Sequence, residues 1–149
     1  MSFEKYSPLI EQLKKQGKIK ASGASVPDTT PHYVIGALVE GKLDSIQLIY
    51  NIFEQFPAWN TIKVCKEHDI AVIVRVPFDE GALTGKYTNE TTFPEGDVRQ
   101  HYFRGNNLKA VVKKINELST YKEKSFPHLS MTDLALKFCL SNDAVSTVI

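Results

Sequence analysis

The sequence predicts an α/β fold built around a parallel sheet. Four short β-rich runs, at residues 19–24, 45–50, 70–76 and 145–149, alternate with helical patterns along the 149 residues. This alternation is typical of βαβ units, which place their strands parallel in one sheet. The third run is apolar at every position from residue 70 to residue 74, as expected of a strand that is covered on both faces.

Length and composition limit the class of protein. The length is that of one domain, and contents of 42% hydrophobic and 23% charged residues are typical of a soluble globular protein. The formal net charge of +1 gives no basic field of the kind that attracts nucleic acid. No apolar run approaches the ~20 residues that cross a bilayer, and the first eleven residues lack the pattern of a secretory signal. Neither nucleic acid nor a membrane is therefore an expected partner.

The two cysteines, Cys65 and Cys139, fall in different predicted helices without the spacing of a metal site. Both are expected to be buried as small apolar side chains. Free cysteines of this kind fit a reducing compartment, so a cytoplasmic location is expected.

The first two helical segments are predicted from an apolar face and from end signals. Leu9, Ile10 and Leu13 form one face before the first strand, and Gly17 is a suitable C-cap. Thr30 followed by Pro31 predicts a threonine-capped start for the second helix, with proline at its first position. The buried face of that helix is expected to contain Val34, Ile35, Leu38 and Val39.

Three further helices complete the pattern. One covers about residues 59–68 and turns Ile62 and Cys65 inward. Ser130 and Asp133 resemble a capping box that opens the last helix, which continues through Leu134, Phe138 and Leu140. The helix between these two has the clearest apolar repeat, formed by Leu108, Val111, Val112, Ile115 and Leu118.

Ligand groups in parallel α/β folds gather at the C-terminal ends of the strands. The predicted ends fall at residues 23–26, 50–51 and 75–78, and the fourth strand ends at Ile149. The third end enters a long irregular stretch, residues 77–106, and loops of this length are usually functional.

Within this stretch, residues 81–86 read Gly-Ala-Leu-Thr-Gly-Lys. Glycines let a backbone approach a phosphate closely, and a lysine supplies the compensating charge. The segment is not a Walker A loop, because only three residues separate its glycines and Tyr87 follows the lysine. The pattern alone is consistent with either a phosphate-binding loop or a plain surface turn.

Several motifs together resemble the aldo-keto reductase family. Residues 17–25, which end on Gly-Ala-Ser, and residues 43–51 resemble the fifth and sixth βα units of that family. Residues 81–87, 93–99 and 134–149 resemble the seventh and eighth units. Nearly the whole chain is covered in the family's order and spacing.

The resemblance implies that residues 1–149 form one partial domain: the C-terminal half of a TIM-type (β/α)8 barrel, about units five to eight, ending before the last helix. It implies NADP, less often NAD, as the cofactor, with Ser25 and Gln47 hydrogen-bonded to the nicotinamide carboxamide. Residues 81–86 would lie against the pyrophosphate. The cofactor-binding set implied by the resemblance is Ser25, Gln47, Arg75, Pro77, Gly81, Leu83, Gly85 and Lys86.

The sequence departs from the family's pattern at three positions. Val26 stands where the family often has asparagine or arginine, and Val76 stands where a serine is frequent. Arg75 stands where an aromatic ring commonly stacks on the nicotinamide. An arginine can also lie flat against a ring, and its charge beside a ring that becomes cationic on oxidation would favour the reduced cofactor.

No catalytic residue is assigned, because the family's tetrad of Asp, Tyr, Lys and His belongs to the first four units. Tyr50 ends a strand, but its sequence context resembles the sixth strand, so a packing or pocket-wall role is expected. The four histidines are expected to be solvated. Asp97 and Arg99 are expected to form a pair that orders their loop, and direct contact with the cofactor is the alternative role.

The implied function is NAD(P)-dependent reduction of a small carbonyl substrate to an alcohol by hydride transfer. This chain would supply the half that binds nicotinamide and pyrophosphate, and would be inactive alone. Two alternatives remain: a non-catalytic binding module of the same fold, and a truncated fragment without its own activity. Half a barrel leaves two strand edges uncovered, so a homodimer or a matching N-terminal half is expected to cover them.

Overall fold

The computed structural model describes residues 3–149, in which strands and helices alternate along the chain. The strands are β1 (Gly23–Ser25), β2 (Ser45–Ile49), β3 (Ala71–Arg75) and β4 (Val145–Val148). The helices, with η marking the 3₁₀ type, are α1 (Phe3–Lys15), η1 (Pro31–Val34), α2 (Ile35–Val39), α3 (Phe56–Trp59), α4 (Thr61–Glu67), η2 (Ala82–Thr84), α5 (Val98–Tyr102), α6 (Asn107–Ser125) and α7 (Met131–Leu140).

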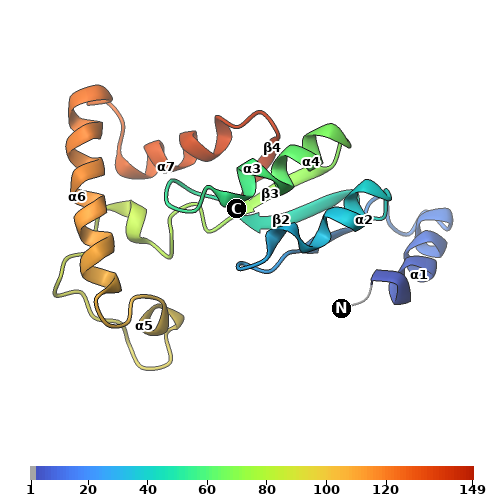
Figure 1. The fold of residues 1–149 in the computed structure, drawn as a ribbon, viewed down its shortest axis with the longest axis horizontal. Coiled ribbons are helices and arrows are strands. Elements are labelled where there is room, and N and C mark those ends of the chain that lie inside the picture. Colours follow the sequence, from blue (N-terminus) through green and yellow to red (C-terminus); the bar gives the residue numbers. More distant parts are fainter. Residues whose placement is uncertain (1–2) are drawn as a thin grey trace.

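Within the described residues, four strands form one parallel sheet in chain order, β1-β2-β3-β4. This confirms the predicted parallel α/β class. The sheet lies in the middle of the molecule, with α1 at one end and α6 at the other (Figure 1). The first strand begins at Gly23 rather than at residue 19, because the chain before it bonds elsewhere: the Ser22 main-chain N–H donates to the Asp44 carboxylate at 2.7 Å.

One face of the sheet is packed and the other is partly exposed. Ile46, Leu48, Val72 and Val74 are completely buried in an apolar cluster that includes residues of α2, α4 and α7. The alternate positions of β2 and β3 are only partly buried, since side chains along a strand point to opposite faces. The expectation that the third strand is covered on both faces is therefore wrong, because its helices lie on one side.

Gly23 allows β1 to approach β2 closely. The residue pairs with Ser45 in the register of the two strands. A Cβ atom at this position would lie 2.7 Å from the Ser45 main-chain oxygen, which is closer than the two atoms can pack. The alignment of the two strands therefore depends on the absence of a side chain here.

We predict that Gly23→Ala lowers the free energy of unfolding by about 1–3 kcal/mol, the usual cost of forcing atoms into a packed region. Urea denaturation followed by circular dichroism measures the change. Gly36→Ala is the matched control, because no atom lies within 4 Å of a Cβ at that position in α2 and alanine favours a helix. Equal stability of Gly23→Ala and the parent protein would contradict the prediction.

The second and third predicted helices need correction. Thr30 makes no side-chain cap bond, and the segment opens as η1 before it becomes α2. Val39 is 53% exposed, because so short a helix buries a single stripe that contains Leu38. The helix predicted for residues 59–68 is divided at Asn60, whose side chain caps α4.

The remaining helices follow the prediction more closely. The face of α6 buries Leu108, Val111, Val112 and Ile115, and the capping box of Ser130 and Asp133 opens α7. In α1, Leu9 is 54% exposed, so the predicted apolar face of that helix is covered only in part. Both cysteines are free and completely buried, as predicted, and burial raises the pKa of each thiol to about 11.

A second apolar cluster holds the long stretch at residues 77–106. Ala82 and Leu83 of η2 pack with Phe103 and with the buried face of α6. The stretch contains η2 and α5 and is therefore more ordered than the sequence predicted. It connects the end of β3 to α6, beside the sheet (Figure 1).

Candidate functional site

Ser25 and Gln47 lie side by side on the partly exposed face of the sheet. The two residues are partners in the parallel register of β1 and β2. Their neighbours Ala24 and Ile46, which are also paired, belong to the packed side, so alternation turns Ser25 and Gln47 the other way. Ser25 is exposed and Gln47 is half-buried. A hydroxyl and an amide placed in this way offer both donors and acceptors to one planar ligand group.

Arg75 ends β3 on the same face and reaches across the sheet. Its backbone pairs with Ile49 of β2. Its Nη2 donates to the Val26 main-chain oxygen at 3.3 Å and forms an ion pair with the Asp28 carboxylate. The guanidinium group therefore binds the segment that directly follows Ser25. Its Nε is buried without a hydrogen-bond partner in the described part of the chain.

The loop after β3 is held in an unusual backbone conformation. Val76, Asp79 and Glu80 have φ values of 57°, 48° and 54°, a region that costs non-glycine residues roughly 1–2 kcal/mol each. Gly81 continues with φ of 94° and precedes η2. Strained backbone of this kind occurs most often at binding sites and active sites.

Two hydrogen-bonded networks fix this loop. The Tyr87 hydroxyl donates to the Glu80 main-chain oxygen at 2.7 Å and accepts from Arg99 Nη1 at 3.3 Å. The Tyr102 hydroxyl donates to the buried Asp79 carboxylate at 2.6 Å. Burial raises the pKa of Asp79 although this hydrogen bond opposes it. The loop is thus tied to both ends of α5.

Asp97 and Arg99 form the pair that the sequence predicted. Arg99 Nε and Nη2 donate to the two carboxylate oxygens at 2.9 and 2.6 Å, and the Arg99 main-chain N–H adds a third bond at 2.9 Å. These hydrogen bonds lower the pKa of Asp97 to about 2. The guanidinium carbon also lies 5.2 Å from the centre of the Phe93 ring. Arg99 is consequently fixed in orientation while remaining 39% exposed.

A cavity of about 370 Å³ lies at the C-terminal ends of β3 and β4. It is lined by Val76 and Pro77 at the end of β3, by Ile149 after β4, and by Gly81. Arg99 also lines it and brings a fixed positive charge, while Glu80 contributes a negative one. The sequence favoured a loop-ordering role for Arg99 over direct contact with a ligand, and it did not predict the place of Arg99 in this cavity, since no local pattern shows where the guanidinium points.

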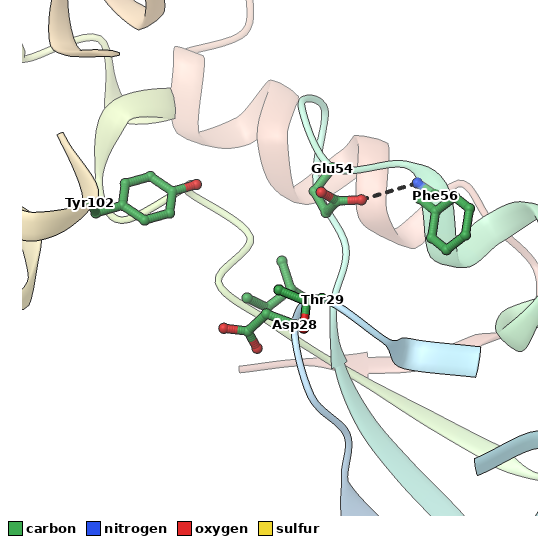
Figure 2. A pocket seen from close by; sticks show the side chains of 6 residues that line it. Asp28, Thr29, Glu54, Phe56 and Tyr102 are labelled. Carbon is green, nitrogen blue, oxygen red and sulfur yellow. Dashed lines mark hydrogen bonds between the residues drawn. The ribbon is translucent and has the colours of Figure 1, made fainter. Parts of the chain in front are cut away.

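A second cavity, of about 400 Å³, lies beyond the ends of β1 and β2, and Figure 2 shows the side chains that line it. The Phe56 and Tyr102 rings give it apolar walls. Its two carboxylates have partners within the chain: Asp28 pairs with Arg75, and Glu54 accepts the Phe56 main-chain N–H at 3.2 Å. The cavity therefore offers mainly shape and aromatic surface to a small molecule.

The structure divides the expected cofactor-binding residues into three groups. Ser25, Gln47 and Arg75 share one face of the sheet, and Pro77 and Gly81 line the cavity at the ends of β3 and β4. Leu83 is completely buried in the second apolar cluster, so its side chain faces away from solvent. Gly85 and Lys86 are exposed, and neither lines the 370 Å³ cavity.

Tyr50 and the histidines occupy the positions expected of them. Tyr50 is 6% exposed and packs against Phe138, with ring centres 5.4 Å apart, which confirms its packing role. His32, His68, His101 and His128 are all exposed. Among residues 3–149, no helix is long and apolar enough to span a membrane. Among residues 5–149, whose side chains the structure describes, no group of three His, Cys, Asp or Glu side chains is placed to hold a metal ion.

Comparison with known sequences identifies relatives among nicotinamide-dependent enzymes. Residues 2–149 match the profile described as the aldo/keto reductase family. The chain is 28% identical over 109 residues to the NADH-specific methylglyoxal reductase of Escherichia coli K12, covering 73% of this chain and 33% of that protein. It is also 28% identical over 126 residues to the aldo-keto reductase yakc [NADP(+)] of Schizosaccharomyces pombe, covering 79% of this chain and 36% of that protein. The chain thus spans about a third of these relatives' length.

Solved structures show the same partial correspondence. The glycerol dehydrogenase AKR11B4 of Gluconobacter oxydans superposes with a TM-score of 0.81 at 22% identity, over 99% of this chain and 45% of the other. The apo form of the aldo-keto reductase AKR11C1 of Bacillus halodurans gives a TM-score of 0.66 at 26% identity, over 99% of this chain and 46% of the other. The first likeness shows the shared fold, and both match somewhat less than half of a longer chain.

Proposed function

The chain belongs to the aldo/keto reductase family, and from that membership we propose that it is the cofactor-binding half of an NAD(P)-dependent oxidoreductase. It corresponds in this proposal to the C-terminal units of the family's (β/α)8 barrel. The reaction is the reduction of a small carbonyl compound to an alcohol. One relative bears NADP(+) in its name and another is NADH-specific. We propose NADP as the cofactor, with NAD as the alternative.

The observation that supports this proposal best is the pairing of Ser25 with Gln47 on the partly exposed face of the sheet. Within residues 3–149, neither side chain is engaged in a hydrogen bond. Both are therefore available to a planar amide, which carries one acceptor and two donors. The nicotinamide carboxamide fits this pair of side chains.

The cavity at the ends of β3 and β4 is the proposed pyrophosphate site. Gly81 brings main chain to the cavity, and the oriented guanidinium of Arg99 can donate to phosphate oxygens. Lys86 follows Gly81 in the sequence and is exposed, but it does not line the cavity. We assign the main electrostatic role to Arg99, because its position is fixed by Asp97 and Tyr87.

The bound cofactor supplies the hydride, and the residues of this chain orient it. Ser25 and Gln47 fix the plane of the nicotinamide, and the loop after β3 holds the phosphates. Reduction of a carbonyl also requires a positioned proton donor. Tyr50 does not meet this need, because its ring is packed in the core. We propose that the proton donor belongs to the complementary half of the barrel.

The two edge strands of the sheet form the proposed contact surface for that complementary half. β1 and β4 are the two edges of the sheet, and such edges present unpaired main-chain groups. A closed barrel pairs these edges. A second copy of this chain is the alternative occupant of the same surface.

The test is dinucleotide binding measured by isothermal titration calorimetry with NADPH and NADH. We predict that Ser25→Ala with Gln47→Ala weakens binding about 10–100-fold, because two hydrogen bonds to the carboxamide are lost. Ser146→Ala is the control for a serine that already has a partner within the sheet, the Val72 main-chain N–H. Affinity that is unchanged in the double variant would contradict the assignment of Ser25 and Gln47.

A second candidate function is that of a non-catalytic binding module with the same fold. The departures from the family's pattern at Val26, Arg75 and Val76 favour it, since these residues follow directly after β1 and at the end of β3, beside the proposed nicotinamide site. Dinucleotide binding by the assembled protein without turnover on any of a panel of aldehydes and ketones would favour this candidate over the oxidoreductase.

A further inference from the structure

Arg75 places a positive charge next to the proposed nicotinamide ligands. The side chain starts from β3, and its Nη2 reaches the carbonyl of Val26, the residue after Ser25. Arg75 pairs with Ile49, which follows Gln47 by two residues and lies on the same face of the sheet. The Arg75 side chain therefore passes over the end of β2. A ring held by Ser25 and Gln47 would therefore lie on the face of the sheet that also carries this guanidinium.

The charge of Arg75 is balanced by a single carboxylate that is mostly exposed. Asp28 is its ion-pair partner, and that carboxylate side chain is 62% exposed, whereas the Arg75 side chain is 24% exposed. Both of its hydrogen bonds go through a single nitrogen, Nη2. The buried Nε has no partner within residues 3–149. Solvent screens the exposed Asp28 carboxylate more than the half-buried guanidinium, so the positive charge is the less screened of the two.

We infer that Arg75 is a specificity-determining residue that makes this site bind the reduced nicotinamide cofactor more tightly than the oxidised one. The inference rests on the proposed function. The oxidised nicotinamide ring carries a positive charge and the reduced ring carries none, so only the oxidised form is repelled by the guanidinium. Asp28 opposes this repulsion, since its negative charge attracts the oxidised ring.

The experiment is calorimetric titration of the protein with NADPH and NADP⁺, and in parallel with NADH and NAD⁺. The measured quantity is the ratio of the Kd of the oxidised form to the Kd of the reduced form. Arg75→Gln should lower this ratio by about three- to tenfold, the effect expected of one partly screened charge at close range. Asp28→Asn should raise the ratio, because the guanidinium loses its counter-charge.

The opposite directions separate this role from a structural one. Both substitutions break the same ion pair, so a role limited to holding the segment after β1 would change both variants in the same direction. Arg104→Gln is the control for an exposed arginine and should leave the ratio unchanged. If Arg75→Gln fails to fold, as judged by circular dichroism, the rise in Asp28→Asn still tests the inference.

If the protein binds dinucleotides but neither substitution changes the ratio of the two Kd values, the role of Arg75 is overturned and the proposed function stays intact. A parallel change in both variants would overturn it as well. Failure of the parent protein to bind any of the four dinucleotides would overturn the proposed function itself, and the inference with it.

Discussion

Replacing Leu83 by alanine should lower the free energy of unfolding by about 2–5 kcal/mol, the range measured for large-to-small changes in protein cores. Leu83 is completely buried between the loop after β3 and the apolar face of α6. Its main-chain N–H also donates to the Phe78 main-chain oxygen at 2.9 Å, so the buried side chain belongs to a hydrogen-bonded turn. Urea denaturation monitored by circular dichroism measures the loss.

Leu140→Ala is the control for this substitution. Leu140 ends α7 and is 55% exposed, so its truncation should change stability by no more than about 0.5 kcal/mol. Because Leu83 supports residues 81–86, its loss should also weaken dinucleotide binding. A Leu83→Ala variant as stable as Leu140→Ala would mean that the second apolar cluster contributes little to folding.

Arg99→Gln should weaken the binding of NADPH by about 10–100-fold. The substitution removes a charge-assisted hydrogen bond to the proposed pyrophosphate, and such bonds contribute about 1.5–3 kcal/mol. It also removes the donor to the Tyr87 hydroxyl, which holds the Glu80 main chain. Calorimetric titration with NADPH measures the change, and the loss should grow smaller as the salt concentration rises.

Two further variants separate charge from loop order. Asp97→Asn keeps the cation but removes the ionic partner that orients it, so a direct electrostatic role predicts a smaller loss than in Arg99→Gln. An equal loss in both variants would show that Arg99 acts only by ordering the loop. Lys86→Gln should have a weaker effect than Arg99→Gln, because Lys86 does not line the cavity. A larger loss of affinity in Lys86→Gln than in Arg99→Gln would place the phosphate site at residues 81–86 instead.

Much of the fold follows from patterns that are local in the sequence. The repeat of Leu108, Val111 and Ile115 specifies one face of a helix, and the capping box of Ser130 with Asp133 specifies where the next helix begins. These signals are reliable because all the interacting groups lie within a few residues of one another. The prediction that Thr30 caps an α-helix was wrong, because threonine followed by proline is also compatible with the start of a 3₁₀ helix.

The candidate site was predictable only in part. The resemblance of the motifs was sufficient to select Ser25 and Gln47, and the parallel register then placed them side by side. The role of Arg75 in binding Asp28, 47 residues earlier in the chain, was not visible in the sequence. The direction of a side chain at the end of a strand depends on which groups of the neighbouring strands it can contact, and the pairing of the strands in the sheet decides which groups those are.

The sequence by itself determined that this chain is a parallel α/β protein with strand ends rich in polar and glycine residues, because hydrophobic periodicity and end signals are properties of short segments. Only the tertiary structure decided which face of the sheet is packed and that Arg99 rather than Lys86 lines the cavity at the ends of β3 and β4. The physical reason is that burial and charge placement arise from contacts between segments distant in the chain. Such contacts exist only once the strands have paired and the helices have covered one side.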